Sequence, residues 1–195
     1  MTLKGHTDSV EDLCFKPKSE HILCSVGVDR SLLIWDIRQG VEPVRIVREV
    51  HASDINTVDW SYQNENLIAT GSNDATVKIL DIRKLPSEQT SDATAAQSAV
   101  TCTLRGHKAK VQSVKFSPFS SRYLASSGDS LILWDIEAGN LKPENDHEEI
   151  KQGQSPEDHV ILDHIGHIGT VSDFDWNHLS PWTLVSASDD SESFV

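Results

Sequence analysis

The sequence predicts an all-β fold built from four copies of one unit. Each copy starts with a histidine, carries a serine or threonine 19 residues later, and has an aspartate shortly after that hydroxyl. Short apolar runs lie between these residues and alternate with turn-forming stretches. Self-similarity at this spacing is typical of repeat architectures. The repeated residues are His6, Ser25 and Asp29; His51, Thr70 and Asp74; His107, Ser126 and Asp129; and His167, Ser186 and Asp190.

Four short strands are expected in each complete unit, because short apolar runs between turn residues favour strands and no long helical period competes with them. First strands, in which apolar and polar residues alternate, are expected at about 10–15, 55–60, 111–116 and 171–176. Second strands are expected at about 22–24, 67–69, 123–125 and 183–185. Third strands follow the aspartate at about 32–35, 77–80 and 131–134. Fourth strands precede the next histidine at about 44–47, 100–104 and 160–162, and the last unit is expected to stop after two strands.

The ends of the units indicate how these strands are arranged. Trp35-Asp36, Leu80-Asp81 and Trp134-Asp135 close the first three units, and a Gly-His pair opens most of them. Four strands between such an entrance and exit describe one blade of a β-propeller. The chain therefore resembles the WD-repeat family over nearly its whole length, outside two insertions.

The resemblance implies a buried tetrad in each blade, formed by the histidine, the hydroxyl, the aspartate and a tryptophan. A neutral imidazole can bridge a carboxylate and a hydroxyl while the indole donates its N–H, so each buried polar group has a partner. Trp35 and Trp134 complete the first and third tetrads, whereas Leu80 stands at this position in the second unit and removes a donor. The third unit is two residues shorter before its tryptophan, so a distorted aspartate turn is expected there.

The chain has 195 residues, too few for seven blades of about 40 residues each. We expect an incomplete propeller, a C-terminal-half fragment of a longer protein. It would contain three four-stranded blades and a partial fourth, over about 6–48, 51–104, 107–163 and 167–195. Such a half-propeller would expose an apolar face at each end, so the chain is expected to self-associate or to need a partner.

Composition excludes several classes of function. There are 30 acidic and 17 basic residues, giving a formal net charge of −13, which disfavours direct binding to nucleic acid or anionic membranes and suits a basic partner. No segment is long and apolar enough to span a membrane. Cys14, Cys24 and Cys102 lack ligand-like spacing, so neither a disulfide framework nor a metal site is expected. No cofactor is expected.

Two insertions separate the units. Residues 86–98 are small and polar, and residues 137–158 are strongly acidic, so both are expected to be flexible loops. The second ends in Gln154-Ser155-Pro156-Glu157-Asp158, and Pro181-Trp182-Thr183 follows later. Together these motifs resemble the retinoblastoma-binding, MSI-type histone-binding subfamily, and Ser188-Asp189-Asp190 is most similar to its plant branch. Ser155-Pro156 is in addition a candidate site for proline-directed phosphorylation.

The resemblance implies a noncatalytic scaffold in the nucleus. Its partners would be core histones or basic tail peptides, and subunits of chromatin assembly, histone deacetylase or Polycomb complexes. In this subfamily, residues three and five positions after each blade histidine receive basic peptides at the narrow top of the propeller. The expected peptide-binding residues of this chain are Glu11, Asp54, Asn56 and Ser172. Lys110 and Gln112 depart from the acid and aromatic that the subfamily carries at these positions, which puts the third blade's contribution in doubt.

Two other interpretations are open. Trp35-Asp36-Ile37-Arg38 and the weaker Leu80-Asp81-Ile82-Arg83 resemble the WDxR box that docks substrate receptors onto a cullin-RING ubiquitin ligase adaptor, with Arg38 and Arg83 as the docking residues. The recurring Ser, His and Asp could also be taken for a hydrolase triad. A catalytic triad would occur once and need an accessible nucleophile, so no catalytic residue is expected.

Overall fold

The computed structural model describes residues 1–85, 97–138, 159–190 and 193–194. Most of the two expected loops, including Ser155-Pro156, therefore lies outside the described residues. Residues 97 and 98 were expected to belong to the first loop, but they form a helical turn together with residue 99. That turn leads directly into the next strand, so the loop prediction was wrong at this end.

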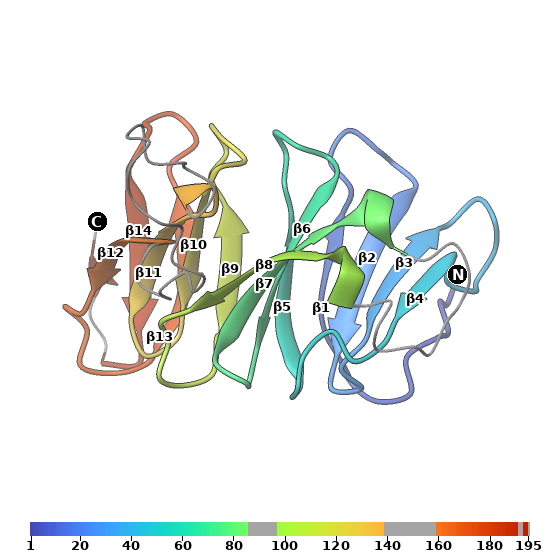
Figure 1. Ribbon diagram of the computed structural model, residues 1–195, viewed down its shortest axis with the longest axis horizontal. Coiled ribbons are helices and arrows are strands. Elements are labelled where there is room, and N and C mark those ends of the chain that lie inside the picture. The colour runs from blue at the N-terminus through green and yellow to red at the C-terminus, as the bar shows by residue number, and fades with distance from the viewer. Residues whose placement is uncertain (86–96, 139–158, 191–192, 195) are drawn as a thin grey trace, which may run out of the picture.

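Four antiparallel sheets follow one another along the chain, which confirms the predicted all-β repeat fold (Figure 1). The first contains β1 (Val10–Phe15), β2 (Ile22–Gly27), β3 (Leu32–Asp36) and β4 (Arg45–Val47). The second contains β5 (Ile55–Trp60), β6 (Leu67–Ser72), β7 (Thr76–Asp81) and β8 (Val100–Arg105), with a 3-10 turn η1 (Ile82–Lys84) after β7. The third contains β9 (Ser113–Phe116), β10 (Tyr123–Ser127), β11 (Leu131–Asp135) and β12 (Val160–His164).

The fourth sheet has three strands, β13 (Val171–Trp176), β14 (Leu184–Ser188) and β15 (Ser193–Phe194). The expectation that this unit stops after two strands was wrong. Ser193 pairs with Ala187 and Phe194 with Ser186, so even two residues past the aspartate turn extend the antiparallel order. The propeller is incomplete, as expected, with three four-stranded sheets and one shorter sheet.

In each sheet the strands follow chain order, so the first strand of every unit lies at one edge. These inner strands neighbour one another in the order β1, β5, β9 and β13, and the sheets stand side by side from the N-terminal to the C-terminal one (Figure 1). Each inner strand runs away from its unit's histidine. All the histidine segments therefore lie at one end of the sheets, which we call the top face, and the ends of β3, β7 and β11 lie at the opposite end.

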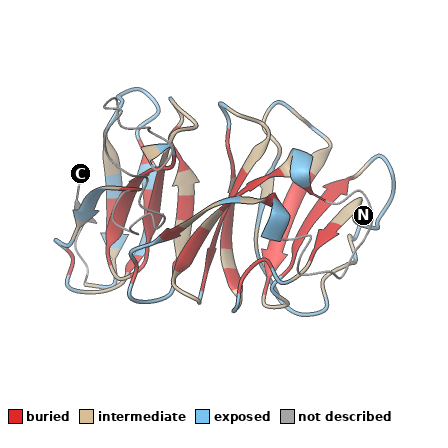
Figure 2. Ribbon diagram, in the orientation of Figure 1, coloured by how far each residue is buried: buried red, intermediate tan, exposed pale blue. Residues whose placement is uncertain are grey.

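Apolar side chains between neighbouring sheets form the core. One cluster joins the first and second sheets and contains Val26, Leu32 and Trp60, all buried. A second cluster joins the second and third sheets around Ile79, Val114 and Trp134. In the second and third sheets both faces of the middle strands are covered, because successive strand residues point to opposite faces and a sheet packs on each side. Figure 2 shows the middle strands of the first three sheets as mostly buried, whereas β14 in the fourth sheet is largely intermediate or exposed.

The inner strand β1 is the exception. Val10, Leu13 and Phe15 are each more than half exposed, whereas Val58 and Trp60 at the matching positions of β5 are 4% exposed. The sequence pattern is the same in both strands. The difference arises because β5 packs against the first sheet and no described sheet packs against this side of β1.

Candidate functional site

The repeated histidines join side chains from separate strands. In the first sheet His6 Nε2 lies 2.8 Å from Ser25 Oγ, its Nδ1 lies 3.0 Å from Asp29, and Trp35 Nε1 donates to Ser25 Oγ at 2.9 Å. The third sheet repeats this arrangement with distances of 2.7 Å from His107 to Ser126, 2.9 Å to Asp129 and 2.8 Å from Trp134 to Ser126. The shorter turn in the third unit was expected to be distorted, but its histidine and aspartate keep contact distance.

One direction of donation satisfies every group in these two tetrads. The indole N–H donates to the serine oxygen, the serine O–H donates to Nε2, and the imidazole N–H at Nδ1 donates to the carboxylate. The aspartate also accepts the backbone N–H of the residue after the histidine, from Thr7 at 2.9 Å and from Lys108 at 3.2 Å. Each tetrad therefore fastens the top-face segment to the middle strands.

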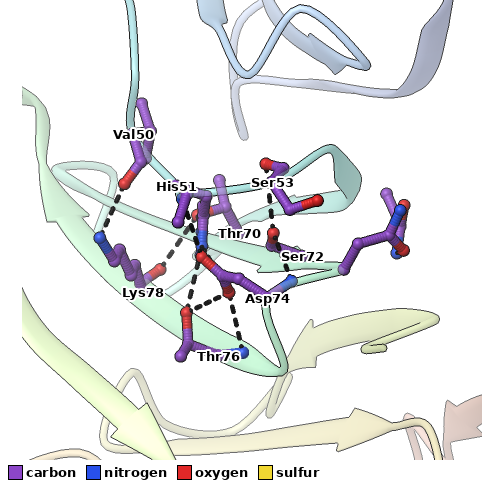
Figure 3. A network of polar contacts seen from close by, with 11 residues as sticks. Val50, His51, Ser53, Thr70, Ser72, Asp74, Thr76 and Lys78 are labelled. Carbon is purple, nitrogen blue, oxygen red and sulfur yellow. Dashed lines mark hydrogen bonds and ion pairs between the residues drawn. The ribbon is translucent and has the colours of Figure 1, made fainter. Parts of the chain in front are cut away.

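The second sheet replaces the missing tryptophan with other contacts (Figure 3). His51 Nε2 lies 2.9 Å from Thr70 Oγ1, and its Nδ1 lies 3.1 Å from Asp74. Thr76 Oγ1 lies 3.1 Å from His51 Nδ1 and donates to Asp74 at 2.6 Å. Leu80 stands where the indole would be and is fully buried. The hydroxyl of Thr76 thus adds a polar partner that the sequence pattern did not reveal.

The fourth sheet forms the same contacts at longer range. His167 Nε2 lies 3.0 Å from Ser186 Oγ, and its Nδ1 lies 3.4 Å from Asp190 Oδ1. The aspartate accepts the backbone N–H of Ile168 at 2.7 Å. In all four sheets, therefore, hydrogen bonds join the segment that carries the histidine to the middle strands.

Burial sets the electrostatics of these groups. Burial lowers the pKa of His51 and of His107, although the neighbouring aspartates oppose this shift. Burial also disfavours ionised Asp74, but the hydrogen bonds from His51 and Thr76 outweigh it and hold the pKa of that carboxyl below its usual range. The imidazoles of His51 and His107 are therefore neutral near pH 7. Ser25 and Ser126 are at most 4% exposed, so neither hydroxyl can reach a substrate as a nucleophile.

Three of the four expected peptide-binding residues occupy the same kind of backbone irregularity, each in its own strand. The pairing of β1 with β2 skips Glu11, that of β5 with β6 skips Asn56, and that of β13 with β14 skips Ser172. An extra residue in one strand is a β-bulge, which leaves that residue out of the ladder and re-aims its side chain. The sequence places these residues five positions after the histidine, but only the register shows that this position is a bulge.

The expected binding residues differ in how they are held. Glu11 and Ser172 are exposed, and the Ser172 hydroxyl donates to the carbonyl of Ala187 at 3.3 Å. Asn56 is half-buried and donates through Nδ2 to Asn73 Oδ1 at 2.8 Å and to the Val111 carbonyl at 2.7 Å. Asp54 accepts from Asn73 Nδ2 at 3.0 Å. These four residues are spread over different sheets and turns of the top face. Two of them, Asp54 and Asn56, are brought together in the second sheet because both bond to Asn73. The sequence pattern did not single out Asn73.

The opposite end of the sheets carries three arginines with one geometry. Arg38 holds Asp36 through Nε at 2.9 Å and Nη2 at 2.7 Å, and Arg83 holds Asp81 at 3.0 and 2.6 Å. Arg122 holds Asp135 through the same two nitrogens at 2.8 and 2.6 Å. Arg122 comes from the turn before β10 and not from a Trp-Asp-x-Arg motif, so the sequence motif missed it. These guanidinium groups hold the pKa of Asp36, Asp81 and Asp135 below the usual range.

Other site types lack support among the described residues. No group of three or more His, Cys, Asp or Glu side chains in this part of the chain is arranged to hold a metal ion. None of its helices has the length and apolar character needed to cross a membrane. Cys14, Cys24 and Cys102 are thiols, and the Sγ atoms of Cys14 and Cys24 face each other at 3.3 Å across β1 and β2.

Comparison with known proteins places the repeats in a family. The model of the family described as "WD domain, G-beta repeat" matches residues 1–36, 42–81 and 98–135. The chain is 39% identical over 191 residues to "WD-40 repeat-containing protein MSI4" of Arabidopsis thaliana, covering 97% of this chain and 35% of that protein. It is 32% identical over 189 residues to "Histone acetyltransferase type B subunit 2" of Debaryomyces hansenii, covering 95% of this chain and 43% of that protein.

A third relative is "WD-40 repeat-containing protein MSI3" of Arabidopsis thaliana, 32% identical over 190 residues, with 96% of this chain and 41% of that protein covered. These relatives agree with the MSI-type resemblance of the sequence. The chain spans less than half the length of each of these three curated relatives.

Proposed function

Because this chain belongs to the WD-repeat family, we propose that it is a noncatalytic scaffold of chromatin complexes that presents its top face to basic peptides. Its ligands are core histones or their basic tails, and it works in the nucleus without a cofactor. Its protein partners are subunits of chromatin assembly, histone deacetylase or Polycomb complexes. The name of one relative, a histone acetyltransferase subunit, supports this class of partner.

The observation that carries this proposal is the chemistry of the bulge positions on the top face. The bulges turn Glu11 and Asn56 out of their strand ladders, and Asp54 lies on the same face two residues before Asn56. Carboxylates form charge-assisted hydrogen bonds with lysine and arginine. The formal net charge of −13 adds a long-range attraction for basic ligands. Ser172 supplies a weaker polar contact from the fourth sheet.

The third sheet contributes least. Lys110 is exposed on the same face and repels a basic peptide, and β9 begins only at Ser113, after the position of Gln112. The peptide therefore binds mainly along the first and second sheets.

Charge reversal on the top face tests the proposal. Binding of a fluorescent histone-tail peptide is measured by anisotropy at two salt concentrations for the wild type and for Glu11→Lys and Asp54→Lys. Both substitutions should weaken binding, and higher salt should weaken wild-type binding. The matched control is Glu20→Lys, an exposed acid in the turn at the opposite end of the first sheet. Peptide binding that is equal in all four proteins would contradict the proposal.

A second candidate function is docking to a cullin-RING ligase adaptor through the opposite end of the sheets. The observation that favours it is the rigid hold on Arg38 and Arg83, whose side chains are 59% and 68% exposed while their aspartates are nearly buried. In each arginine Nε and Nη2 bond the aspartate, so Nη1 points away from that carboxylate. A partner surface carrying carboxylates could accept these donors.

A further inference from the structure

A row of polar side chains crosses from the third sheet to the second at the top face. It runs from the carbonyl of Val111 through the amides of Asn56 and Asn73 to the carboxylate of Asp54, with distances of 2.7, 2.8 and 3.0 Å. The backbone fixes both ends of the row. The Val111 N–H donates to Ser72 O at 3.0 Å, and the Asn73 N–H donates to Asp54 O at 3.0 Å.

The direction of donation along this row is forced. The Val111 carbonyl can only accept, so the group of Asn56 that faces it must be the NH2 group. The second N–H of the same group then requires Asn73 to present Oδ1. Asn73 in turn must direct its NH2 group to Asp54, which accepts when ionised. A flip of either amide would set two acceptors against each other.

This direction decides what the second sheet presents to a ligand. Both hydrogens of the Asn56 amide are used, so its Oδ1 remains as an acceptor. Asp54 receives Asn73 on Oδ2, and its Oδ1 has no further partner among the described residues. Ammonium and guanidinium groups carry several donors and no acceptor, so they match a pair of remaining acceptors.

The first and fourth sheets carry other residues at the position of Asn73. The backbone N–H of Asn73 donates to the residue three positions after the blade histidine, and the same bond identifies its equivalents in other sheets. Val28 N–H donates to Ser9 O at 3.0 Å in the first sheet, and Asp189 N–H donates to Thr170 O at 3.2 Å in the fourth. Neither valine nor aspartate can accept on one side and donate on the other. The first and fourth sheets therefore cannot build the same row.

We propose that Asn73 is a positioning residue that holds Asp54 and Asn56 as paired acceptors for the cationic head group of one lysine or arginine side chain. This inference rests on the proposed binding of basic peptides at the top face. Beyond that function, the inference gives Asn73 a role next to the two acceptor residues. It also predicts that the second sheet binds a cationic side chain, which only donates hydrogen bonds, more tightly than a neutral amide.

The test compares wild type, Asn73→Leu and the matched control Val28→Ala, which changes the same position of the first sheet. The probes are a 12-residue peptide of Lys, Arg, Gly and Ala and the same peptide with glutamine at every cation. The net contribution of a typical intramolecular hydrogen bond corresponds to a change of about 3- to 10-fold in an equilibrium constant. Asn73→Leu should therefore bind the cationic peptide about 3- to 10-fold more weakly, while its affinity for the glutamine peptide and that of Val28→Ala for both stay at the wild-type level.

A second readout separates the row from the binding function. In the free wild-type protein, both side-chain N–H protons of Asn56 should exchange slowly with solvent in NMR spectra, and Asn73→Leu should accelerate the exchange of one of them. Unchanged Asn56 exchange, or unchanged discrimination between the two peptides by Asn73→Leu, would overturn the positioning role of Asn73 and leave the proposed function intact. Failure of the wild type to bind the cationic peptide at all would overturn both.

Discussion

The backbone N–H of Val58 donates to Oδ2 of Asp12 at 2.8 Å, across the boundary between the second and first sheets. The next boundary repeats this relationship, because Val114 N–H donates to Thr57 Oγ1 at 3.3 Å and Phe116 N–H donates to Asp59 Oδ2 at 2.7 Å. Neighbouring inner strands are thus joined by side chains of one strand and the backbone of the next. We call these hydrogen bonds between neighbouring inner strands the seam. Because hydrogen bonds are directional and hydrophobic packing is not, the seam fixes how each inner strand is aligned with the next.

Asp12→Ala should weaken the first seam. Val58 is 4% exposed, so its N–H would lose its partner in a place that water reaches poorly. An orphaned buried donor costs about 1–3 kcal/mol. Urea unfolding should show a loss of this size, whereas Asp8→Ala, at an exposed aspartate that accepts from the Ser9 N–H, should change stability by less than about 0.5 kcal/mol. Equal losses in the two variants would refute a special role for the seam.

Asp59 should make stability depend on pH in an unusual direction. Burial raises the pKa of this carboxyl to about 6, although hydrogen bonds from Phe116 and Trp60 oppose the shift. The unfolded chain releases the proton near pH 4 and the folded chain near pH 6, so between these values the folded state binds more protons and loses stability as pH rises. Burial also lowers the pKa of His51 and of His107, so these groups contribute to the pH dependence of stability as well.

The Asp59 contribution is isolated by comparison with Asp59→Asn. The stability of the variant relative to wild type should increase between pH 4 and pH 7 by up to about 3 kcal/mol, the equivalent of a shift of about two pKa units. Chemical denaturation of both proteins at several pH values measures this difference. A difference that is constant over the whole range would show that Asp59 is not titrating with a raised pKa.

Trp134→Leu should be strongly destabilising even though Leu80 occupies the same position of the second sheet. Trp134 is fully buried and supplies the N–H that Ser126 accepts, and among the described residues of the third sheet no threonine contacts His107 as Thr76 contacts His51. Loss of the indole volume and of its hydrogen bond should cost about 3–5 kcal/mol.

Thermal unfolding would report the Trp134→Leu change as a large drop in Tm. The matched control is Trp182→Leu. Trp182 is 57% exposed, so its replacement should cost less than about 1 kcal/mol. A similar drop in Tm for both variants would argue that tryptophan content, and not the tetrad, sets stability.

The open side of β1 should drive self-association of this chain. Leu13 and Phe15 are 55% and 54% exposed on a face that is buried in the other inner strands. Exposed apolar patches on strands promote association with another copy. Sedimentation velocity should show a concentration-dependent increase in mass that Leu13→Asp/Phe15→Asp reduces and Leu179→Asp, at a residue 93% exposed in a loop, does not. A wild-type protein that remains monomeric at all concentrations would contradict this expectation.

The arginine end of the sheets allows a test of the second candidate function. If this end docks a ligase adaptor, Arg38→Ala, Arg83→Ala and Arg122→Ala should each weaken adaptor binding, because all three present their guanidinium groups in the same way. Surface plasmon resonance with the purified adaptor measures the effect, and Arg105→Ala, an exposed arginine at the end of β8, serves as control. Full adaptor affinity in all variants, or no adaptor binding by the wild type, would remove this function.

Much of the fold was predictable because it is repeated locally. The alternation of Val10, Leu13 and Phe15 with polar residues is written out again in three later strands, so strand boundaries could be averaged over copies. The fixed spacing of His107, Ser126 and Asp129 predicted which side chains meet. Prediction failed where one copy had few residues to judge from, as in β15, whose two residues lie just before the end of the chain.

The candidate site was less predictable, because its geometry depends on residues that do not follow the repeat. Asn73 stands where the first sheet has Val28, and Arg122 reaches an aspartate thirteen residues later along the chain. Neither residue matches a motif, since each acts through contacts in space that the repeat does not specify.

Spacing and composition alone predicted the order of strands in the first three sheets, the hydroxyl and aspartate partners of each histidine and the strongly acidic character of the chain. Which apolar residues are buried depends instead on how the sheets pack against one another. Leu13 and Val58 share one pattern, yet only Val58 has a neighbouring sheet to cover it. The structure also decided the direction of the Asn56 and Asn73 amides, because that direction is set by the carbonyl of Val111, a backbone group 55 residues away from Asn56 that approaches only when the second and third sheets pack together.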